Sequence, residues 1–324
     1  MNATDAPRPR FSLRRFIVRR LQFIAVAMPL ACAVLLLPVD GFIMELLRQF
    51  RLWNAVIGLA TGVLLLLLRD WKFAGIALLA GLWQGWPVVQ YQFFPDGKQN
   101  IPEPARLTLL TCNLHYECRE PERMIASLQE ANPDVLLLLE FTPEWQRKFH
   151  DSMWKDYPHR LEAPQPGYAG LCLASRLPLE HAQVFEVAGG VPAVRAVVAL
   201  ANEKITLLGV HPPPPMRPEL YETWRQSFEE WPALLGNDGH RVLAGDLNCT
   251  PFARTFTAFC ERTGLRDSAR GFGLRNTWHI AGTPLGLPLD HVLVSKQLLV
   301  ASRTVGTAPG SDHHWVMVWL GRSP

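Results

Sequence analysis

Charged residues are absent from three long stretches near the amino terminus of this 324-residue chain. Residues 21–37, 52–68 and 73–95 contain no Asp, Glu, Lys or Arg. Each stretch is close to the ~20 apolar residues that an α-helix needs to cross a bilayer. A soluble structure is therefore disfavoured here, and we expect a membrane anchor over residues 21–94, with about three transmembrane helices near 21–39, 52–68 and 73–94.

The first apolar run also lacks a cleavage site, because no small-x-small pattern closes it at residues 36–40. A signal peptide is the alternative, since Arg14, Arg15, Arg19 and Arg20 precede the run. Two further apolar runs follow, which favours a retained anchor. Lys and Arg are concentrated before the first run, so residues 1–20 are predicted to be a basic cytoplasmic tail. Three crossings then place the rest of the chain outside the cytoplasm, in the periplasm if the protein is a multi-pass protein of a bacterial inner membrane.

The remainder of the chain lacks an excess of positive charge. Residues 1–106 contain 12 Lys and Arg and 6 Asp and Glu, whereas residues 107–324 contain 20 and 23. A domain that grips long duplex DNA normally carries a strong basic surface. The composition therefore argues against that class of partner.

Cysteine is scarce, and no pair among the six has the spacing of a metal site. Cys32 lies in an apolar run, and the sequence does not decide whether any of the other five form a disulfide. Repeats and low-complexity tracts are also absent, which excludes a solenoid. A short polar segment at residues 95–106, rich in Pro, Asp and Gly, reads as a linker.

From residue 107 onward, short apolar runs alternate with amphipathic stretches. We expect helices at 120–132, 221–235 and 252–263, and strands at 107–112, 135–139, 171–174, 194–200, 205–210, 241–244, 291–294 and 315–320. This order predicts an α+β domain at residues 107–322, in which helices cover two packed sheets.

Polar side chains follow or cap several of these strands, where a sheet presents functional groups from a rigid base. They are Asn113, Glu140, His211, Asp246, Asn248, Asp290, Asp312 and His313. Their order and spacing resemble the endonuclease/exonuclease/phosphatase superfamily, which has the fold of pancreatic deoxyribonuclease. Abasic-site endonucleases, neutral sphingomyelinases and inositol-phosphate phosphatases belong to the same superfamily. The resemblance implies a four-layer α/β/β/α sandwich over residues 107–322.

The resemblance also implies that Glu140 and Asp312 hold a metal ion, with Asn113 beside them. Hard oxygen ligands suit Mg²⁺, with Mn²⁺ as the alternative ion. Glu140 follows an apolar strand, where a carboxylate is costly to desolvate unless it is paired or bound to metal. Asp312 alone would read as a turn residue after Gly310.

Asp290 is expected to orient His313, because a carboxylate makes an imidazole a useful acid or base at neutral pH. Asp246 and Asn248 lie two residues apart and project to one face of an extended segment, which suits binding of water and phosphate. An Asx-turn is the structural alternative for this pair. His211 is expected at the phosphate only through its place in the family pattern. The sequence does not decide whether Asp246 or His313 is the general base.

Together these features predict a membrane-anchored, Mg²⁺-dependent phosphoesterase or nuclease that uses water to cleave phosphodiester bonds. The expected partners are the lipid bilayer and a phosphodiester substrate, either nucleic acid or a phospholipid head group, and no protein partner is inferable. A lipid phosphodiesterase of the sphingomyelinase type, an inositol-phosphate phosphatase and a non-catalytic membrane binding module are the alternatives.

Overall fold

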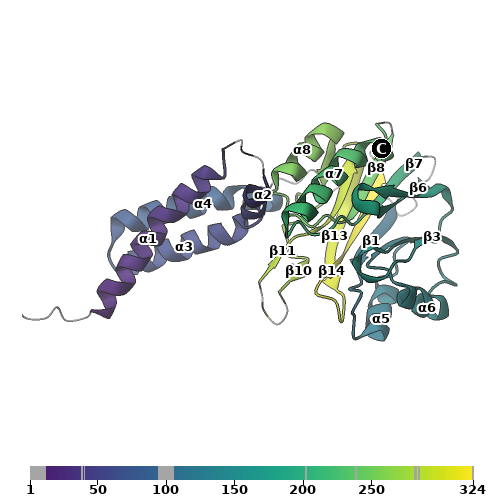
Figure 1. Ribbon diagram of the computed structural model, residues 1–324, viewed down its shortest axis with the longest axis horizontal. Coiled ribbons are helices and arrows are strands. Elements are labelled where there is room, and N and C mark those ends of the chain that lie inside the picture. The colour runs from purple at the N-terminus through teal and green to yellow at the C-terminus, as the bar shows by residue number, and fades with distance from the viewer. Residues whose placement is uncertain are drawn as a thin grey trace, which may run out of the picture. The chain divides into compact units, whose positions relative to one another are not determined.

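The computed structural model describes residues 12–37, 39, 41–93, 106–200, 203–237, 239–280, 283 and 285–322 (Figure 1). The expected linker at 95–106 therefore lies almost wholly outside the described residues, as does half of the basic tail at 1–20. The chain divides into two compact units, which are described separately. The first contains residues 1–39 and 50–87, and the second contains residues 40–49 and 88–324.

The first unit is helical. It contains α1 (Leu13–Val34), α3 (Arg51–Leu67) and most of α4 (Trp71–Phe93). Among the helices of the described residues, only α1 is by itself both long and apolar enough to cross a membrane. The pair α2 (Phe42–Arg48) and α3 passes the same test jointly, but with a bend of 57° between them. The expectation of about three transmembrane helices is therefore too high. With 17 residues, α3 is too short by itself, and the Gln, Gly and Trp residues of α4 lower its hydropathy.

Helix packing in the first unit depends on small residues. Its buried positions include Ala25, Ala55, Gly58, Ala74 and Ala77, whereas large side chains such as Phe23, Leu30 and Leu79 are exposed. A Cβ added to Gly81 in α4 would lie 2.7 Å from the backbone nitrogen of Leu59 in α3. Close backbone approach through small residues is typical of helices that associate in lipid.

The second unit contains two six-stranded sheets (Figure 1). The first sheet has the order β13-β14-β1-β2-β4-β3. Its strands are β1 (Leu107–Asn113), β2 (Val135–Leu139), β3 (His159–Ala163), β4 (Leu171–Ser175), β13 (Leu298–Thr307) and β14 (His314–Arg322). The second has the order β5-β6-β7-β8-β12-β9. Its strands are β5 (Leu179–Val187), β6 (Val191–Leu200), β7 (Glu203–Val210), β8 (His240–Asp246), β9 (Leu265–Asp267) and β12 (Asp290–Ser295).

Side-chain alternation along the strands builds the layers. In β1, Leu107 and Leu109 pack between the two sheets, while Leu110 and Cys112 face outward against helices. The helices α5 (Pro121–Ala131) and α6 (Pro143–Ser152) cover the first sheet, and α7 (Pro218–Leu235) and α8 (Arg254–Thr263) cover the second. The four-layer sandwich that the sequence indicated is thus confirmed. A short hairpin of β10 (Trp278–His279) and β11 (Gly286–Leu287) lies outside both sheets.

Candidate active site

The predicted polar residues meet at one edge of the sandwich. Asn113 ends β1, Glu140 directly follows the parallel strand β2, and Asp246 ends β8, which runs parallel to β7. The antiparallel strand β12 begins at Asp290, which is the register partner of Asp246. Parallel strands bring their carboxyl ends to the same edge, and the reversed β12 brings its amino end there. The site is therefore assembled from both sheets.

Glu140 is held in a strained backbone conformation. Its φ of 56° is in the left-handed region, which a residue with a Cβ adopts at a cost. The side chain is buried, and its Oε1 accepts a hydrogen bond from the Asn113 amide at 2.9 Å. Its Oε2 accepts from the backbone N–H of Tyr116 at 2.8 Å. The sharp turn after β2 thus aims this carboxylate across the end of β1.

Asn113 has a different geometry from the one expected of a metal ligand. Its side-chain nitrogen faces two carboxylates, Glu140 at 2.9 Å and Asp246 at 3.4 Å. Its Oδ1 is already occupied, because it accepts the N–H of His115 at 3.0 Å. Asn113 thus bridges the two acids through its amide nitrogen.

His115 was not singled out from the sequence, yet its Nδ1 lies between the two acids expected to bind metal. It is 3.8 Å from Glu140 Oε2 and 3.7 Å from Asp312 Oδ1. The second oxygen of Asp312 accepts a hydrogen bond from the Trp278 indole at 2.9 Å. His115 follows Asn113 by two residues, and side chains at that spacing project to the same face of an extended segment. That spacing was the one sequence signal for His115.

His313 lies between two other carboxylates. Its Nδ1 is 2.8 Å from Asp290 Oδ2, and its Nε2 is 3.5 Å from Asp246 Oδ2. Burial disfavours the charged imidazole and lowers its pKa, but the carboxylates of Asp290 and Asp246 outweigh burial and raise the pKa to about 10. The imidazole is consequently held as a cation at neutral pH.

Asp246 is the most heavily contacted acid of the site. Burial raises its pKa, but the charge of His313 and a hydrogen bond from His211 more than compensate, so that the pKa is lowered overall. His211 Nε2 lies 3.5 Å from Asp246 Oδ2. Burial lowers the pKa of His211, and the hydrogen bond to Asp246 raises it by more. Asp246 is therefore ionised and flanked by two imidazoles.

Asn248 follows Asp246 in a tight turn. Its backbone N–H donates to Asp246 Oδ1 at 2.8 Å, and its side-chain amide donates to the Pro212 carbonyl at 2.9 Å. Its φ of 50° is also left-handed. The Asx-turn considered as an alternative is thus present, and it coexists with the placement of both residues at the site.

Two groups of residues offer donor atoms for a metal ion, and they differ in chemistry. Atoms of Asp246, Asp290 and His313 lie within 4.8 Å of one another. Both nitrogens of His313 already face carboxylates, and a histidine must be neutral to bind metal. Glu140 and Asp312 instead each place a carboxylate oxygen within 3.8 Å of His115 Nδ1. Oxygen donors of this kind fit Mg²⁺, which needs only one or two protein carboxylates and keeps several waters.

Other histidines and the cysteines lie apart from this chemistry. His291 is buried and contacts the Cys249 carbonyl at 2.9 Å and Asp267 at 3.3 Å, so it supports the loop after β8. The ring of His314 packs edge-to-face against the ring of His279. All six cysteines are free thiols.

Comparison with known proteins agrees with this geometry. Residues 110–313 match the Endonuclease/Exonuclease/phosphatase family, and the chain belongs to it. None of the curated proteins is similar in sequence to this chain. The fold is similar to that of an endonuclease/exonuclease/phosphatase from Beutenbergia cavernae DSM 12333. That likeness has 17% identity and a TM-score of 0.57, and it covers 68% of this chain and 72% of that one.

Two further solved structures share the fold. One is a humanised TDP2 from D. rerio, with 15% identity and a TM-score of 0.56 over 67% of this chain and 99% of that chain. The other is the 3′ phosphatase NExo from Neisseria bound to a product DNA hairpin, with 18% identity and a TM-score of 0.55 over 65% of this chain and 98% of that chain. With its family membership, the chain is a metal-dependent hydrolase.

Proposed function

We propose that this protein is a membrane-anchored, Mg²⁺-dependent phosphodiesterase that cleaves its substrate by attack of water. The observation that supports this most directly is the row Asp290–His313–Asp246, which Asn113 links to the Glu140 carboxylate. Asp312 lies near Glu140 on the other side of His115. This arrangement combines a cationic acid, an ionised base and an oxygen-rich metal position, which are the parts that hydrolysis of a phosphodiester requires.

Glu140 and Asp312 would hold the ion, with Asn113 fixing Glu140 and His115 adjoining both acids. When bound, Mg²⁺ supplies positive charge to the phosphate and to the leaving oxygen. Mn²⁺ suits the same oxygens, and a nearby imidazole favours it further.

Asp246 is our candidate for orienting the attacking water, because its lowered pKa leaves it ionised at neutral pH. His313 is already protonated there, so it suits stabilising charge on a phosphate oxygen better than accepting a proton. Asn248 and His211 lie on either side of Asp246, where an amide N–H and an imidazole can donate to phosphate oxygens.

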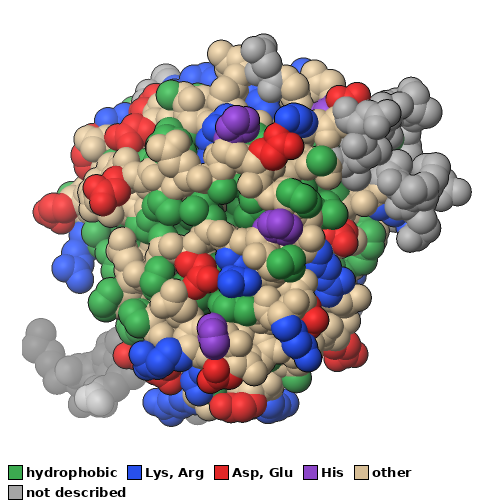
Figure 2. All heavy atoms as spheres, turned by 90° about the vertical axis from the view of Figure 1, so that its right-hand side faces the viewer, with side chains coloured by type: hydrophobic (Ala, Val, Ile, Leu, Met, Phe, Trp, Pro, Cys, Tyr) green, Lys and Arg blue, Asp and Glu red, His purple; other side chains and the backbone are tan. Residues whose placement is uncertain are grey.

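Nucleic acid and phospholipid head groups are both candidate substrates. The face shown in Figure 2 carries interspersed acidic and basic side chains rather than a single basic track. The acidic balance of residues 107–324 favours a short or single phosphodiester over long duplex DNA.

One feature favours a lipid phosphodiesterase as the second candidate. Trp278 of the β10–β11 hairpin contacts Asp312, and the hairpin exposes two large apolar side chains, Ile280 and Leu285. An apolar rim beside a phosphate site suits a substrate with an acyl or sphingoid chain. The tryptophans of α7, Trp224 and Trp231, are buried in the core and do not contribute to such a rim.

Membrane anchoring is supported by the packing of the first unit, where small residues lie between helices and large apolar residues point outward. We propose that α1 is the spanning helix and that it is retained. A single crossing from a cytoplasmic amino terminus places the catalytic domain outside the cytoplasm, in the periplasm for a bacterial inner membrane.

The full-length protein in detergent micelles, with the matched variants Glu140→Gln and His313→Ala, tests the function. The substrate panel contains DNA, RNA, sphingomyelin, phosphatidylinositol phosphates and a chromogenic phosphodiester, each with Mg²⁺, Mn²⁺ or EDTA. We expect turnover that EDTA abolishes and that both variants lose. Retained turnover in Glu140→Gln would contradict the metal assignment, and silence of the wild type on every substrate would contradict the proposed activity.

A further inference from the structure

The short helix α2 belongs to the catalytic unit although it precedes β1 by more than fifty residues. Its Glu45 and the following Gln49 lie four positions apart, so they share one face of the helix. Both side chains are buried, with 3% and 4% of their surface exposed. The ring of Phe42 contacts Tyr221 of α7 at a centroid distance of 6.1 Å. Two buried polar side chains on so short a helix require specific partners.

Glu45 Oε2 pairs with Arg48 of the same helix at 3.2 Å. The partners outside α2 are backbone N–H groups on the chain that follows Asn248. Gln49 Oε1 accepts the N–H of Thr250 at 2.6 Å, and Glu45 Oε1 accepts the N–H of Thr255 at 2.8 Å. Thr255 lies in the first turn of α8, where N–H groups have no partner within the helix. The N-cap residue Ala253 has no side chain that can cap. Glu45 therefore caps α8 from another part of the chain.

Thr250, which bonds to Gln49, follows Asn248 by only two residues. The contacts of α2 therefore hold the chain next to the loop Asp246–Asn248. Several other hydrogen bonds fix the segment after Asp246. Leu247 N–H donates to the Leu289 carbonyl and the Trp224 indole donates to the Leu247 carbonyl. Asn248 donates to the Pro212 carbonyl, and His291 contacts the Cys249 carbonyl. The bond to Gln49 adds to this support. Because Asn248 has a left-handed backbone, this surrounding support determines where Asp246 and Asn248 point.

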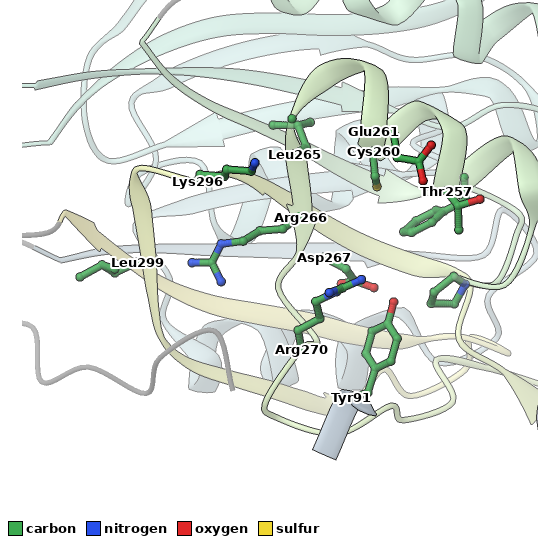
Figure 3. Close-up of a pocket in the computed structure, with 13 residues that line it drawn as sticks. Tyr91, Thr257, Cys260, Glu261, Leu265, Arg266, Asp267, Arg270, Lys296 and Leu299 are labelled. Atoms are coloured by element: carbon green, nitrogen blue, oxygen red, sulfur yellow. The ribbon is translucent and has the colours of Figure 1, made fainter. Parts of the chain in front are cut away.

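The end of α4 contacts the same region from another direction. The Tyr91 carbonyl accepts the N–H groups of Gly271 and Gly273 at 2.7 and 3.0 Å, and its ring lies edge-on to Phe252. Arg270 lies over the Tyr91 ring (Figure 3). An open pocket of about 740 Å³, lined by Tyr91 and by residues of α8 such as Cys260, lies beside α8. The polar contacts of α2 and Tyr91 are therefore important for holding α8 and the loop before it.

We propose that α2 and residues 88–93 position the Asp246–Asn248 loop, so that full turnover depends on segments outside the family-matched range 110–313. Glu45 and Gln49 are positioning residues, since they act through Thr250 and Thr255 without touching the reacting atoms. This inference rests on the proposed function.

The test compares full-length Gln49→Ala and Glu45→Ala with wild type in micelles, by steady-state kinetics and by amide hydrogen exchange. We expect kcat to fall by roughly tenfold to hundredfold with KM within about twofold, because small misplacements of catalytic groups cost that much. Exchange at residues 247–255 should accelerate in both variants while β1 and β2 stay protected.

Two matched variants on α2 serve as controls. Glu45→Gln keeps the acceptor oxygen and should retain near wild-type kcat. Ile43→Ala removes a side chain that is 57% exposed, and it should change neither kcat nor exchange.

Unchanged kcat and unchanged exchange in Gln49→Ala and Glu45→Ala would overturn the inference, as would an equal loss in Ile43→Ala. If wild type shows no turnover, the proposed function fails. The exchange rates of residues 247–255 then still decide whether α2 holds the loop.

Discussion

At the residue scale, the position of His313 between Asp290 and Asp246 has a consequence for pH dependence. The pKa of His313 is raised to about 10, so the imidazolium is present below that pH and is lost as pH rises through it. Activity that depends on this cation should persist through neutral pH and decline near pH 10. In Asp290→Asn one supporting carboxylate is gone, so the decline should move to lower pH. We also expect kcat to fall by about 10²- to 10⁴-fold.

The pH profile of kcat for wild type and Asp290→Asn measures this, and the NMR titration of His313 reports its pKa directly. Substituting the exposed Asp151, which lies outside the site, provides the control. If kcat declines at the same alkaline pH in Asp290→Asn as in wild type, His313 is not the titrating group.

A second residue-scale prediction concerns stability. Burial raises the pKa of Asp267, but the hydrogen bond and charge of His291 lower it by more, so the net shift is downward. A lowered carboxyl pKa stabilises the fold above the unfolded value of about 3.9, and the contribution is lost as pH falls below it. At pH 7 we expect Asp267→Asn to lower the free energy of unfolding by about 1–3 kcal/mol.

The difference in the free energy of unfolding between wild type and Asp267→Asn should then disappear below about pH 4. Urea unfolding of both proteins at pH 7, 5 and 3 measures it. A difference that stays constant across this range would mean that the charge of Asp267 contributes nothing to stability.

The sequence predicted the site residues that end or begin strands, because a polar group after an apolar run is a local signal. It did not predict His115 or Trp278, which approach Asp312 only through the turn after β1 and the β10–β11 hairpin. It also did not predict that Asn113 would turn its nitrogen toward the acids. That orientation depends on the His115 N–H, which is a detail of backbone geometry.

At the scale of elements, the contact between α3 and α4 makes opposite predictions for two glycines of the same helix. A Cβ at Gly81 would lie 2.7 Å from the Leu59 backbone nitrogen, whereas a Cβ at Gly75 meets nothing within 4 Å. Gly81→Ala should therefore destabilise the helical unit by about 1–3 kcal/mol through overpacking.

Gly75→Ala should stabilise the same unit by about 0.5–1 kcal/mol, because alanine favours the helix. Thermal unfolding of the two variants in the same detergent compares them directly. Equal shifts for both would show that α3 and α4 do not pack closely.

Long apolar or amphipathic segments were predicted well, since β1, β2, β4, β7, β8, α5, α7 and α8 lie close to their expected positions. The sequence pattern did not predict the strands β3, β5, β9, β10, β11 and β13 or the helices α2 and α6. The outer strands β3 and β5 are half-exposed and carry polar residues on both faces, so they lack the apolar run that marked the central strands. Their strand structure is determined by pairing with β4 and β6.

At the scale of the whole molecule, the proposal of a retained anchor predicts behaviour in the cell. The protein should stay with membranes after alkaline carbonate extraction, and a version lacking residues 1–37 should be released more readily. Reporter fusions at residue 12 and after residue 322 should report opposite sides of the membrane. Reporters on the same side would contradict a single crossing by α1.

The pairing of β1 with β14 has a consequence for synthesis of the protein. β1 is made about two hundred residues before β14, with which it pairs on one side. Thr250 and Thr255, the partners of α2, are likewise made some two hundred residues after α2. Until β14 is made, one edge of β1 is unpaired, and until Thr255 is made, Glu45 has no N–H to accept. The site is therefore assembled only when almost the whole of the catalytic domain has been synthesised.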